Sequence, residues 1–148
     1  MKPEERQEAI FGAFDGVVSV IGFVFGLLVH HSPAGAIAIG GLGGAIAAAV
    51  SMAAGEIEKS DANWRSRIPV ALVMFAACLI SALVPVWPFF VFSGALAVVL
   101  AVIGCLVVAA WIGWAKHKGL KGYLIAYGIL FGAAGLTLLV VSLIPQSV

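Results

Sequence analysis

The sequence predicts an all-α integral membrane protein with five transmembrane helices, and two observations carry that prediction. Of the 148 residues, 63% are hydrophobic and only 10% are charged, whereas roughly a quarter of the residues in soluble domains are charged. A globule of this size has too little interior to bury so many apolar side chains, so lipid must cover the rest. The apolar residues also form five separate runs, each as long as a membrane-spanning helix.

The five runs, taken in order, are the expected helices of a single domain. They cover residues 10–29, 34–55, 68–87, 89–115 and 123–144. A helix rises 1.5 Å per residue, so about 20 apolar residues cross a hydrocarbon core about 30 Å thick. The fourth run is longer than that, and we expect it to tilt or to extend into the headgroups. None of the runs alternates strictly between apolar and polar residues, which argues against strands.

The basic residues predict the orientation of the chain. All eight Lys and Arg residues lie before the first run, between the second and third, or between the fourth and fifth, which is one side of the membrane. Cytoplasmic loops carry the excess of Lys and Arg in membrane proteins. We therefore expect a cytoplasmic N-terminus and an external C-terminus. The membrane is the inner or plasma membrane in a prokaryote, or a vacuole-type membrane in a eukaryote.

Asp15 is the residue that most clearly points to a function. It lies inside the first predicted helix, roughly 8 Å below the membrane edge. An acidic side chain at mid-helix costs about 2.5–3.5 kcal/mol, and such residues are functional by default. Ser19 follows one turn further along the same helix face, and Glu8 precedes Asp15 on it. The alternative is a carboxylate that reaches the interface or bonds a neighbouring helix.

Glu56 and Met52 lie one turn apart on the second predicted helix, near its cytoplasmic end. Because the first two helices run in opposite directions, Met52 and Asp15 are expected at similar depths. The three residues would then offer two hard carboxylates and one soft thioether, a mixture that suits a borderline transition metal better than Mg²⁺ or Ca²⁺. Each also has a simpler interpretation, because a Glu at a helix end is usually solvated and a lone Met usually packs in the core.

Further polar residues lie near these three in the sequence. Glu4, Glu8 and Glu58 add acidity on the cytoplasmic side, where it attracts cations, although such residues more often solvate a helix end. We expect Glu4, Glu8, Ser19 and Glu58 to surround the site or to line its cytoplasmic access. The roles of the histidines stay open: they are His30 and His31 in an outer turn and His117 in an inner loop.

No catalytic arrangement is apparent. The sequence contains no nucleophile–base pattern, no Gly-rich phosphate loop and no Cys/His zinc spacing. Cys78 and Cys105 both fall within apolar runs, and we expect buried fillers rather than a disulfide or a ligand pair. We therefore expect neither an enzyme nor a permanently bound cofactor, and no nucleic-acid partner.

Glycines at a spacing of four predict close helix packing in the first two helices. The pairs are Gly12 with Gly16, Gly22 with Gly26, and Gly40 with Gly44. Small residues at this spacing let helix backbones approach one another closely. By itself the pattern indicates only that these helices pack against protein, and it is compatible with a homodimer.

Two stretches of the chain resemble a known family. Residues 12–27 read GAFDGVVSVIGFVFGL, and residues 49–56 read AVSMAAGE. They resemble the first two helices of the vacuolar iron transporter family, in which an Asp-Gly pair precedes a Gly-rich run and the second helix carries Ser-Met-Ala-Ala-Gly-Glu. The order of the motifs, the number of helices and the topology also match. The detailed resemblance covers about a third of the chain.

The resemblance implies export of Fe²⁺, and often Mn²⁺, from the cytosol in exchange for protons. It also implies a homodimer whose path runs near the interface and is lined by the first two helices. By motif, Asp15, Met52 and Glu56 match the positions that line this path. The chain departs from many members in having only a short loop, residues 56–67, where they carry a Glu-rich metal-binding domain. Ile57 also stands where the family has a tyrosine-type residue.

We therefore predict a proton-coupled exporter of a divalent transition metal, Fe²⁺ or Mn²⁺, that works as a homodimer surrounded by lipid. Two alternatives stay open. One is a structural or regulatory membrane subunit of the same fold that transports nothing, and the missing loop domain favours it. The other is a transporter of small organic cations, for which we would expect more aromatic residues on the inner helix faces.

Overall fold

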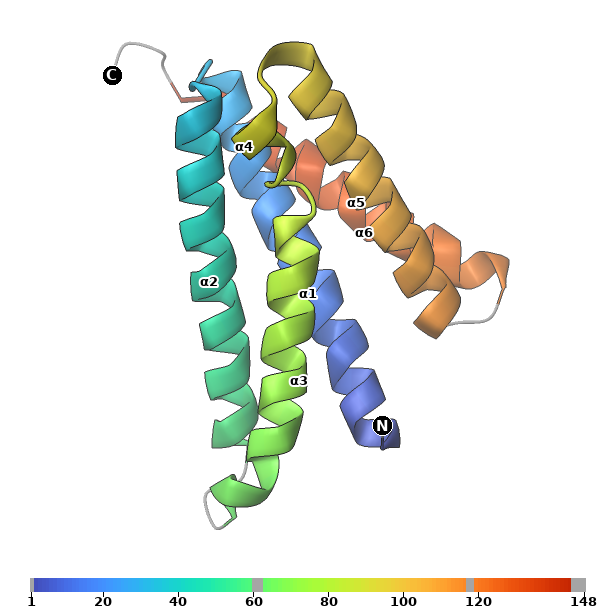
Figure 1. Ribbon diagram of the computed structural model, residues 1–148. Helices are drawn as coiled ribbons and strands as arrows, with labels where there is room; N and C mark the ends of the chain where they lie inside the picture. Colours follow the sequence, from blue (N-terminus) through green and yellow to red (C-terminus); the bar gives the residue numbers. More distant parts are fainter. Residues whose placement is uncertain (1, 60–62, 117–118, 145–148) are drawn as a thin grey trace.

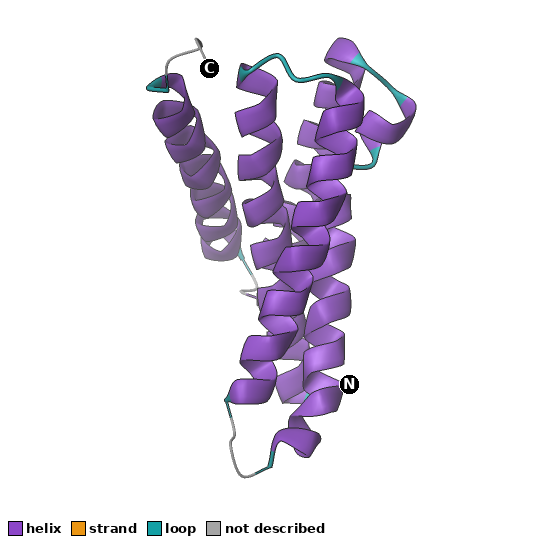
Figure 2. Cartoon of the chain, turned by 90° about the vertical axis from the view of Figure 1, so that its left-hand side faces the viewer, coloured by secondary structure: helices purple, strands orange, loops and turns teal. Residues whose placement is uncertain are grey.

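The computed structural model describes residues 2–59, 63–116 and 119–144, and within these ranges it consists of helices and loops without strands (Figure 1 and Figure 2). The helices are α1 (Pro3–Val29), α2 (Ala34–Glu58), α3 (Trp64–Leu83), α4 (Pro88–Val91), α5 (Gly94–Lys116) and α6 (Leu120–Ser142). All except α4 are long and apolar enough to cross a membrane, which makes five candidate spans. The chain is therefore a multi-pass integral membrane protein, as predicted.

α1 is longer than the first apolar run because a charged N-terminal segment continues into it without a break. It begins at Pro3, and proline suits a first helical position because no N–H is needed there. The backbone N–H of Lys2 donates to the Glu5 carboxylate over 2.9 Å and closes the first turn. Glu4 and Glu8 are therefore carried on the same helix as the membrane segment that follows.

The fourth apolar run is not the single helix expected over residues 89–115, because it divides into α4 and α5. The break comes at Phe92, whose backbone is extended, and at Gly94, whose φ of 65° favours glycine. Phe89 is 5% exposed and belongs to the core, so burying its ring holds α4 against the bundle. The break thus absorbs the excess length of the run, and α5, with 23 residues, fits a bilayer.

α3 also differs from the run expected over residues 68–87, because it begins at Trp64 and ends at Leu83. Ser66 stabilises the early start, since its backbone N–H and its hydroxyl both donate to the Asn63 carbonyl, over 3.1 and 2.8 Å. After α3 the chain turns through Val86, which is fully buried in the core. The last apolar residues of the run therefore form a packed turn, and the polar residues before it are helical.

The other helices depart from the expected runs by less than one turn. α2 extends past residue 55 to Glu58, and α6 spans Leu120–Ser142 in place of residues 123–144. Helical hydrogen bonds continue beyond the apolar residues that define a span, so hydropathy alone misses the polar ends. The extension of α2 places Glu56 inside the helix rather than in the loop.

α1 packs most extensively on α3, and glycines allow the close approach (Figure 1). A Cβ on Gly12 would lie 2.7 Å from the carbonyl oxygen of Met74, and one on Gly16 would overlap the carbonyl of Cys78. α1 also contacts α2, α5 and α6. The predicted close packing of this glycine pair therefore occurs within one chain.

Gly22 and Gly26 also face a helix of the same chain. A Cβ on Gly22 would lie 3.0 Å from Thr137 Oγ1, and one on Gly26 would lie 3.7 Å from Val141 Cγ2, both in α6. These two glycines therefore accommodate α6 in the single chain. The homodimer stays a prediction, and its test requires positions that no helix of the same chain covers.

Candidate functional site

Ion pairs join α1, α2 and α3 at one end of the bundle, and Glu56 lies at their centre. Glu56 is in the last turn of α2 and is 1% exposed. Lys59 Nζ lies 2.5 Å from its Oε2, and Arg67 Nη1, from α3, lies 3.2 Å from its Oε1. The buried carboxylate is therefore held between two cations, one just beyond its own helix and one from the neighbouring helix.

The same two cations also reach carboxylates of α1. Lys59 Nζ lies 3.0 Å from Glu8 Oε1, and Arg67 pairs with Glu4. We refer to Glu4, Glu8, Glu56, Lys59 and Arg67 as the ion-pair cluster. The side chains of Glu4 and Lys59 are about half exposed, so water screens the outer pairs and each contributes at most about 1 kcal/mol. Glu56 differs from them because its side chain has no exposure to water.

Neither oxygen of Glu56 accepts a well-aligned hydrogen bond from the described residues. Both cations nevertheless lie within ion-pair distance of the carboxylate. Burial removes the hydration of a carboxylate, so an anion in this position depends on nearby positive charge. Glu56 is thus a position that requires a cation, and Lys59 and Arg67 supply it in this structure.

Lys59 and Arg67 both remain charged at neutral pH. The Glu56 carboxylate, assisted by Glu8, raises the pKa of Lys59 above its usual value against the opposing effect of burial. A raised pKa means that the ion pairs stabilise the fold below the ordinary lysine pKa, and that this contribution is lost only as the pH rises beyond it. Arginine is protonated at any physiological pH. The cluster therefore keeps its cations under physiological conditions.

The pair between Lys59 and Glu8 indicates the register of the antiparallel helices α1 and α2. Asp15 lies seven residues inward from Glu8, and Met52 lies seven residues inward from Lys59, which is about 10.5 Å along each helix. Counted from this pair, Asp15 and Met52 have similar depths in the bundle. Glu56 lies about one turn closer to the charged end.

Asp15 is half-buried, and so is Met52. In the part of the chain that the structure describes, Asp15 makes neither a hydrogen bond nor an ion pair. No hydrogen bond among the described residues joins Asp15 to Glu56. The two acidic positions singled out from the sequence therefore differ. Glu56 is paired with two cations, whereas Asp15 has no charged partner among the described residues and lies at a depth similar to that of Met52.

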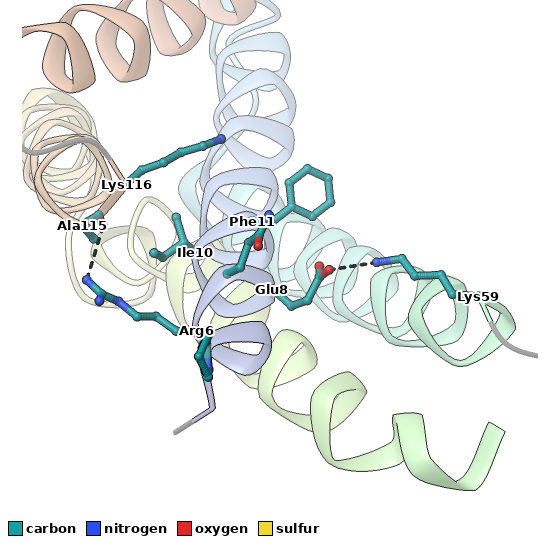
Figure 3. A pocket seen from close by; sticks show the side chains of 9 residues that line it. Arg6, Glu8, Ile10, Phe11, Lys59, Ala115 and Lys116 are labelled. Carbon is teal, nitrogen blue, oxygen red and sulfur yellow. Dashed lines mark hydrogen bonds and ion pairs between the residues drawn. The ribbon is translucent and has the colours of Figure 1, made fainter. Parts of the chain in front are cut away.

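A cavity of about 570 Å³ opens beside the ion-pair cluster (Figure 3). The pair of Glu8 and Lys59 lies on one side of it, and Arg6 reaches towards the other side, where it donates to the Ala115 carbonyl over 3.4 Å. The lining consists of Pro3, Arg6, Gln7, Glu8, Ile10, Phe11, Lys59, Ala115 and Lys116. Water and ions can therefore reach the outer side of the cluster through this cavity.

The residues predicted to surround the site have different positions. Glu4 and Glu8 belong to the ion-pair cluster. Ser19 and Glu58 are exposed, and Glu58 forms no ion pair with the described residues. The histidines His30 and His31 are exposed in the turn at the opposite end of α1, and His117 lies outside the described residues.

No metal site is complete within the described part of one chain. Residues 2–59, 63–116 and 119–144 contain no group of three His, Cys, Asp or Glu side chains that could hold a metal ion. Cys78 and Cys105 are both buried and free, in agreement with the expected role as fillers. Asp15, Met52 and Glu56, on the two antiparallel helices, stay the predicted donors.

Lys59 and Arg67 are neighbours of Glu56 that the sequence did not lead us to predict. Glu56 and Lys59 are three residues apart, a spacing at which opposite charges meet on one helix face, and that signal was available. Arg67 gives no comparable signal, because its approach depends on where α3 begins and on how α3 packs against α2. Only the assembled bundle brings it to Glu56.

Comparison with known proteins points to the same two helices. A model of the VIT family, the vacuolar iron transporters, matches residues 6–57, a segment that contains Asp15, Met52 and Glu56. No curated protein and no solved structure matches the chain. The match confirms the resemblance found in the sequence motifs, and together with the five apolar helices it makes the chain consistent with a member of the VIT family.

Proposed function

We propose that the chain exports a divalent transition metal, Fe²⁺ or Mn²⁺, from the cytosol in exchange for protons, as a homodimer. The family match alone suggests a membrane metal-ion transporter, and the choice of metal, the direction and the coupling are the proposal. The observation that carries it is Glu56, a buried carboxylate within the matched segment that requires a neighbouring cation.

The donor chemistry supports a transition metal. Asp15 and Glu56 offer hard oxygen ligands, and Met52 offers a soft sulfur, a combination that favours Fe²⁺ or Mn²⁺ over Mg²⁺ and Ca²⁺. The register of α1 and α2, which has Asp15 and Met52 at one depth, is compatible with joint binding. A second copy of the chain would double this donor set, so in our proposal the complete site forms between two copies.

The coupling to protons follows from competition for the carboxylates. A carboxylate must lose its proton to bind a metal, and it can regain a proton when the metal leaves. If the site opens to alternate sides of the membrane, this competition exchanges metal for protons. Asp15 is the carboxylate proposed for this role, because it is inside the membrane segment and has no counter-ion among the described residues.

Metal flux into proteoliposomes tests whether the chain transports. Wild-type protein should move Mn²⁺ or Fe²⁺ across the membrane, and Glu56→Gln should remove that flux because an amide cannot replace the anionic ligand. Glu5→Gln is the matched control: Glu5 accepts the Lys2 N–H at the start of α1, an interaction that an amide oxygen preserves, and its flux should equal that of wild type. Flux in the Glu56→Gln variant equal to wild type would exclude Glu56 as a ligand.

A non-transporting subunit of the same fold is the second candidate. The observation that favours it is the neutralisation of Glu56 by Lys59 and Arg67, since ion pairs of this kind also occur in purely structural roles. It predicts that the purified chain folds and inserts normally but gives no metal flux above that of empty vesicles. The same vesicle experiment therefore separates the two candidates.

A further inference from the structure

We propose that Lys59 and Arg67 form a counter-ion latch on Glu56, which an incoming divalent metal must displace, and that Glu8 and Glu4 receive the displaced cations. This inference rests on the proposed function, because it assumes that Glu56 binds the metal. The latch adds one step to the proposed transport: metal binding at Glu56 is an exchange of cations within the ion-pair cluster rather than the filling of a vacant site.

Both oxygens of Glu56 already have a cation close by. One oxygen of Glu56 lies 2.5 Å from Lys59 Nζ, and the other lies 3.2 Å from Arg67 Nη1. The carboxylate has no exposed surface from which a metal could approach without disturbing these cations. A metal ion bound at about 2.0–2.2 Å from a carboxylate oxygen would be a close neighbour of two like charges. Metal and cations therefore cannot occupy Glu56 together.

The second step is that the displaced cations already contact their next partners. Lys59 Nζ is 3.0 Å from Glu8, and Arg67 pairs with Glu4, so neither cation needs to leave the cluster. Both receiving carboxylates belong to α1, whereas Glu56 belongs to α2. Displacement thus leaves Lys59 and Arg67 paired with carboxylates of α1 alone.

The third step concerns the strength of the competing charge. Lys59 and Arg67 are each shared between Glu56 and a carboxylate of α1, so an incoming ion must compete with two cations for one carboxylate. At equal distance a divalent ion attracts a carboxylate twice as strongly as a monovalent ion does. The latch therefore favours divalent over monovalent cations, without any contact that recognises a particular metal.

Equilibrium binding of Mn²⁺ to the purified full chain, followed by the EPR signal of free Mn²⁺, tests the latch. Lys59→Gln and Arg67→Gln each remove one competing charge, so each should bind Mn²⁺ about tenfold more tightly or better. Arg65→Gln is the matched control, because Arg65 lies at the same helix end and stacks on Trp64 outside the ion-pair cluster. Unchanged or weaker binding in both cluster variants would overturn the latch.

The receiving role of Glu8 is tested by a double-mutant cycle. Glu8→Gln should weaken Mn²⁺ binding in the wild-type background, because Lys59 then has no second partner and stays on Glu56. In the Lys59→Gln background the same change should have no effect, since no cation remains to be received. If Glu8→Gln weakens binding equally in both backgrounds, Glu8 contacts the metal itself and the exchange mechanism is wrong.

Two further variants separate the latch from folding and from the proposed function. Lys59→Arg keeps the charge and should bind Mn²⁺ as wild type does, so tightening equal to that of Lys59→Gln would contradict the latch. Glu56→Gln should abolish binding if Glu56 is the ligand. Loss of binding in Glu56→Gln without tightening in Lys59→Gln rejects the latch alone, whereas retained binding in Glu56→Gln rejects the metal site on which it rests.

Discussion

Two acidic residues on the first two helices have opposite surroundings. Glu56 is buried between two cations near the charged end of the bundle, and Asp15 is half-buried about one turn deeper without a charged partner among the described residues. A buried anion and its counter-ions are difficult to separate, because removing either partner leaves an uncompensated charge. The two carboxylates therefore differ in burial and in charged partners, and this difference is the basis of the tasks we propose for them, cation exchange at Glu56 and proton exchange at Asp15.

Met52 tests whether the site uses sulfur. Met52→Leu conserves volume and apolarity, so the chain should fold normally. If the thioether is a ligand, the variant should lose affinity for Fe²⁺ by a larger factor than for Mn²⁺, because the harder ion depends less on sulfur. Competition binding of the two metals on the purified variant measures this ratio. Unchanged affinities for both metals would show that Met52 only packs and that the donors are oxygens.

The sequence predicted the candidate site residues but not the side chains that pair with them. Asp15 was recognisable because an acid in an apolar run is costly, and Met52 and Glu56 were recognisable from a family motif. The burial of Glu56 between Lys59 and Arg67 depends on the relative positions of three helix ends, which no local pattern encodes. Ser19 and Glu58 are exposed, and the roles expected for them stay predictions.

The contact between α1 and α3 depends on close backbone approach, and it yields a prediction about stability. Gly12→Ala adds a methyl group 2.7 Å from the Met74 carbonyl, so α1 must move away from α3. We expect a loss of about 1–3 kcal/mol, as for other overpacked contacts. The unfolding midpoint of the purified protein measures this loss.

Gly128→Ala in α6 is the control for that substitution. A Cβ at Gly128 meets nothing within 4 Å, and replacing a helical glycine by alanine is neutral or favourable by roughly 0.5–1 kcal/mol. Equal midpoints for Gly12→Ala and Gly128→Ala would contradict the close contact between α1 and α3.

The five spans were predictable from hydropathy, and their ends were not. Apolar runs identify a membrane segment because lipid contact imposes the same requirement along the whole helix. Boundaries depend on local contacts, such as Ser66 at the start of α3 and the positive φ of Gly94 at the start of α5. Phe89 and its neighbours are as apolar as a span, so only their packing against the core distinguishes α4 from a continuation of α5.

The whole molecule has a predicted orientation that cysteine labelling can test. Asn63 is exposed before α3, and Ser142 is exposed at the end of α6. An impermeant thiol reagent should reach Asn63→Cys from the cytoplasmic side only and Ser142→Cys from the other side only. The native Cys78 and Cys105 are fully buried and provide an unlabelled background. Labelling of both positions from one side would contradict five crossings.

The predicted homodimer is best tested on the open face of α2. A Cβ at Gly43 meets nothing within 4 Å in the single chain, so Gly43→Leu should leave the protomer intact and block close approach of a second copy. Gly132→Leu on α6 is also sterically open and serves as the control for added bulk. Cross-linking in lipid should give dimers for wild type and Gly132→Leu, and fewer for Gly43→Leu. Unreduced dimer in Gly43→Leu would exclude this face.

Gradient-driven metal flux tests the proposed exchange of metal for protons through Asp15. Mn²⁺ uptake is measured in proteoliposomes with and without an imposed pH gradient, for wild type and for Asp15→Asn, which keeps the shape of the side chain but cannot ionise. Wild-type uptake should rise with the gradient, and the variant should lose both tight Mn²⁺ binding and the response to pH. Gradient-driven uptake that persists unchanged in Asp15→Asn would contradict the account.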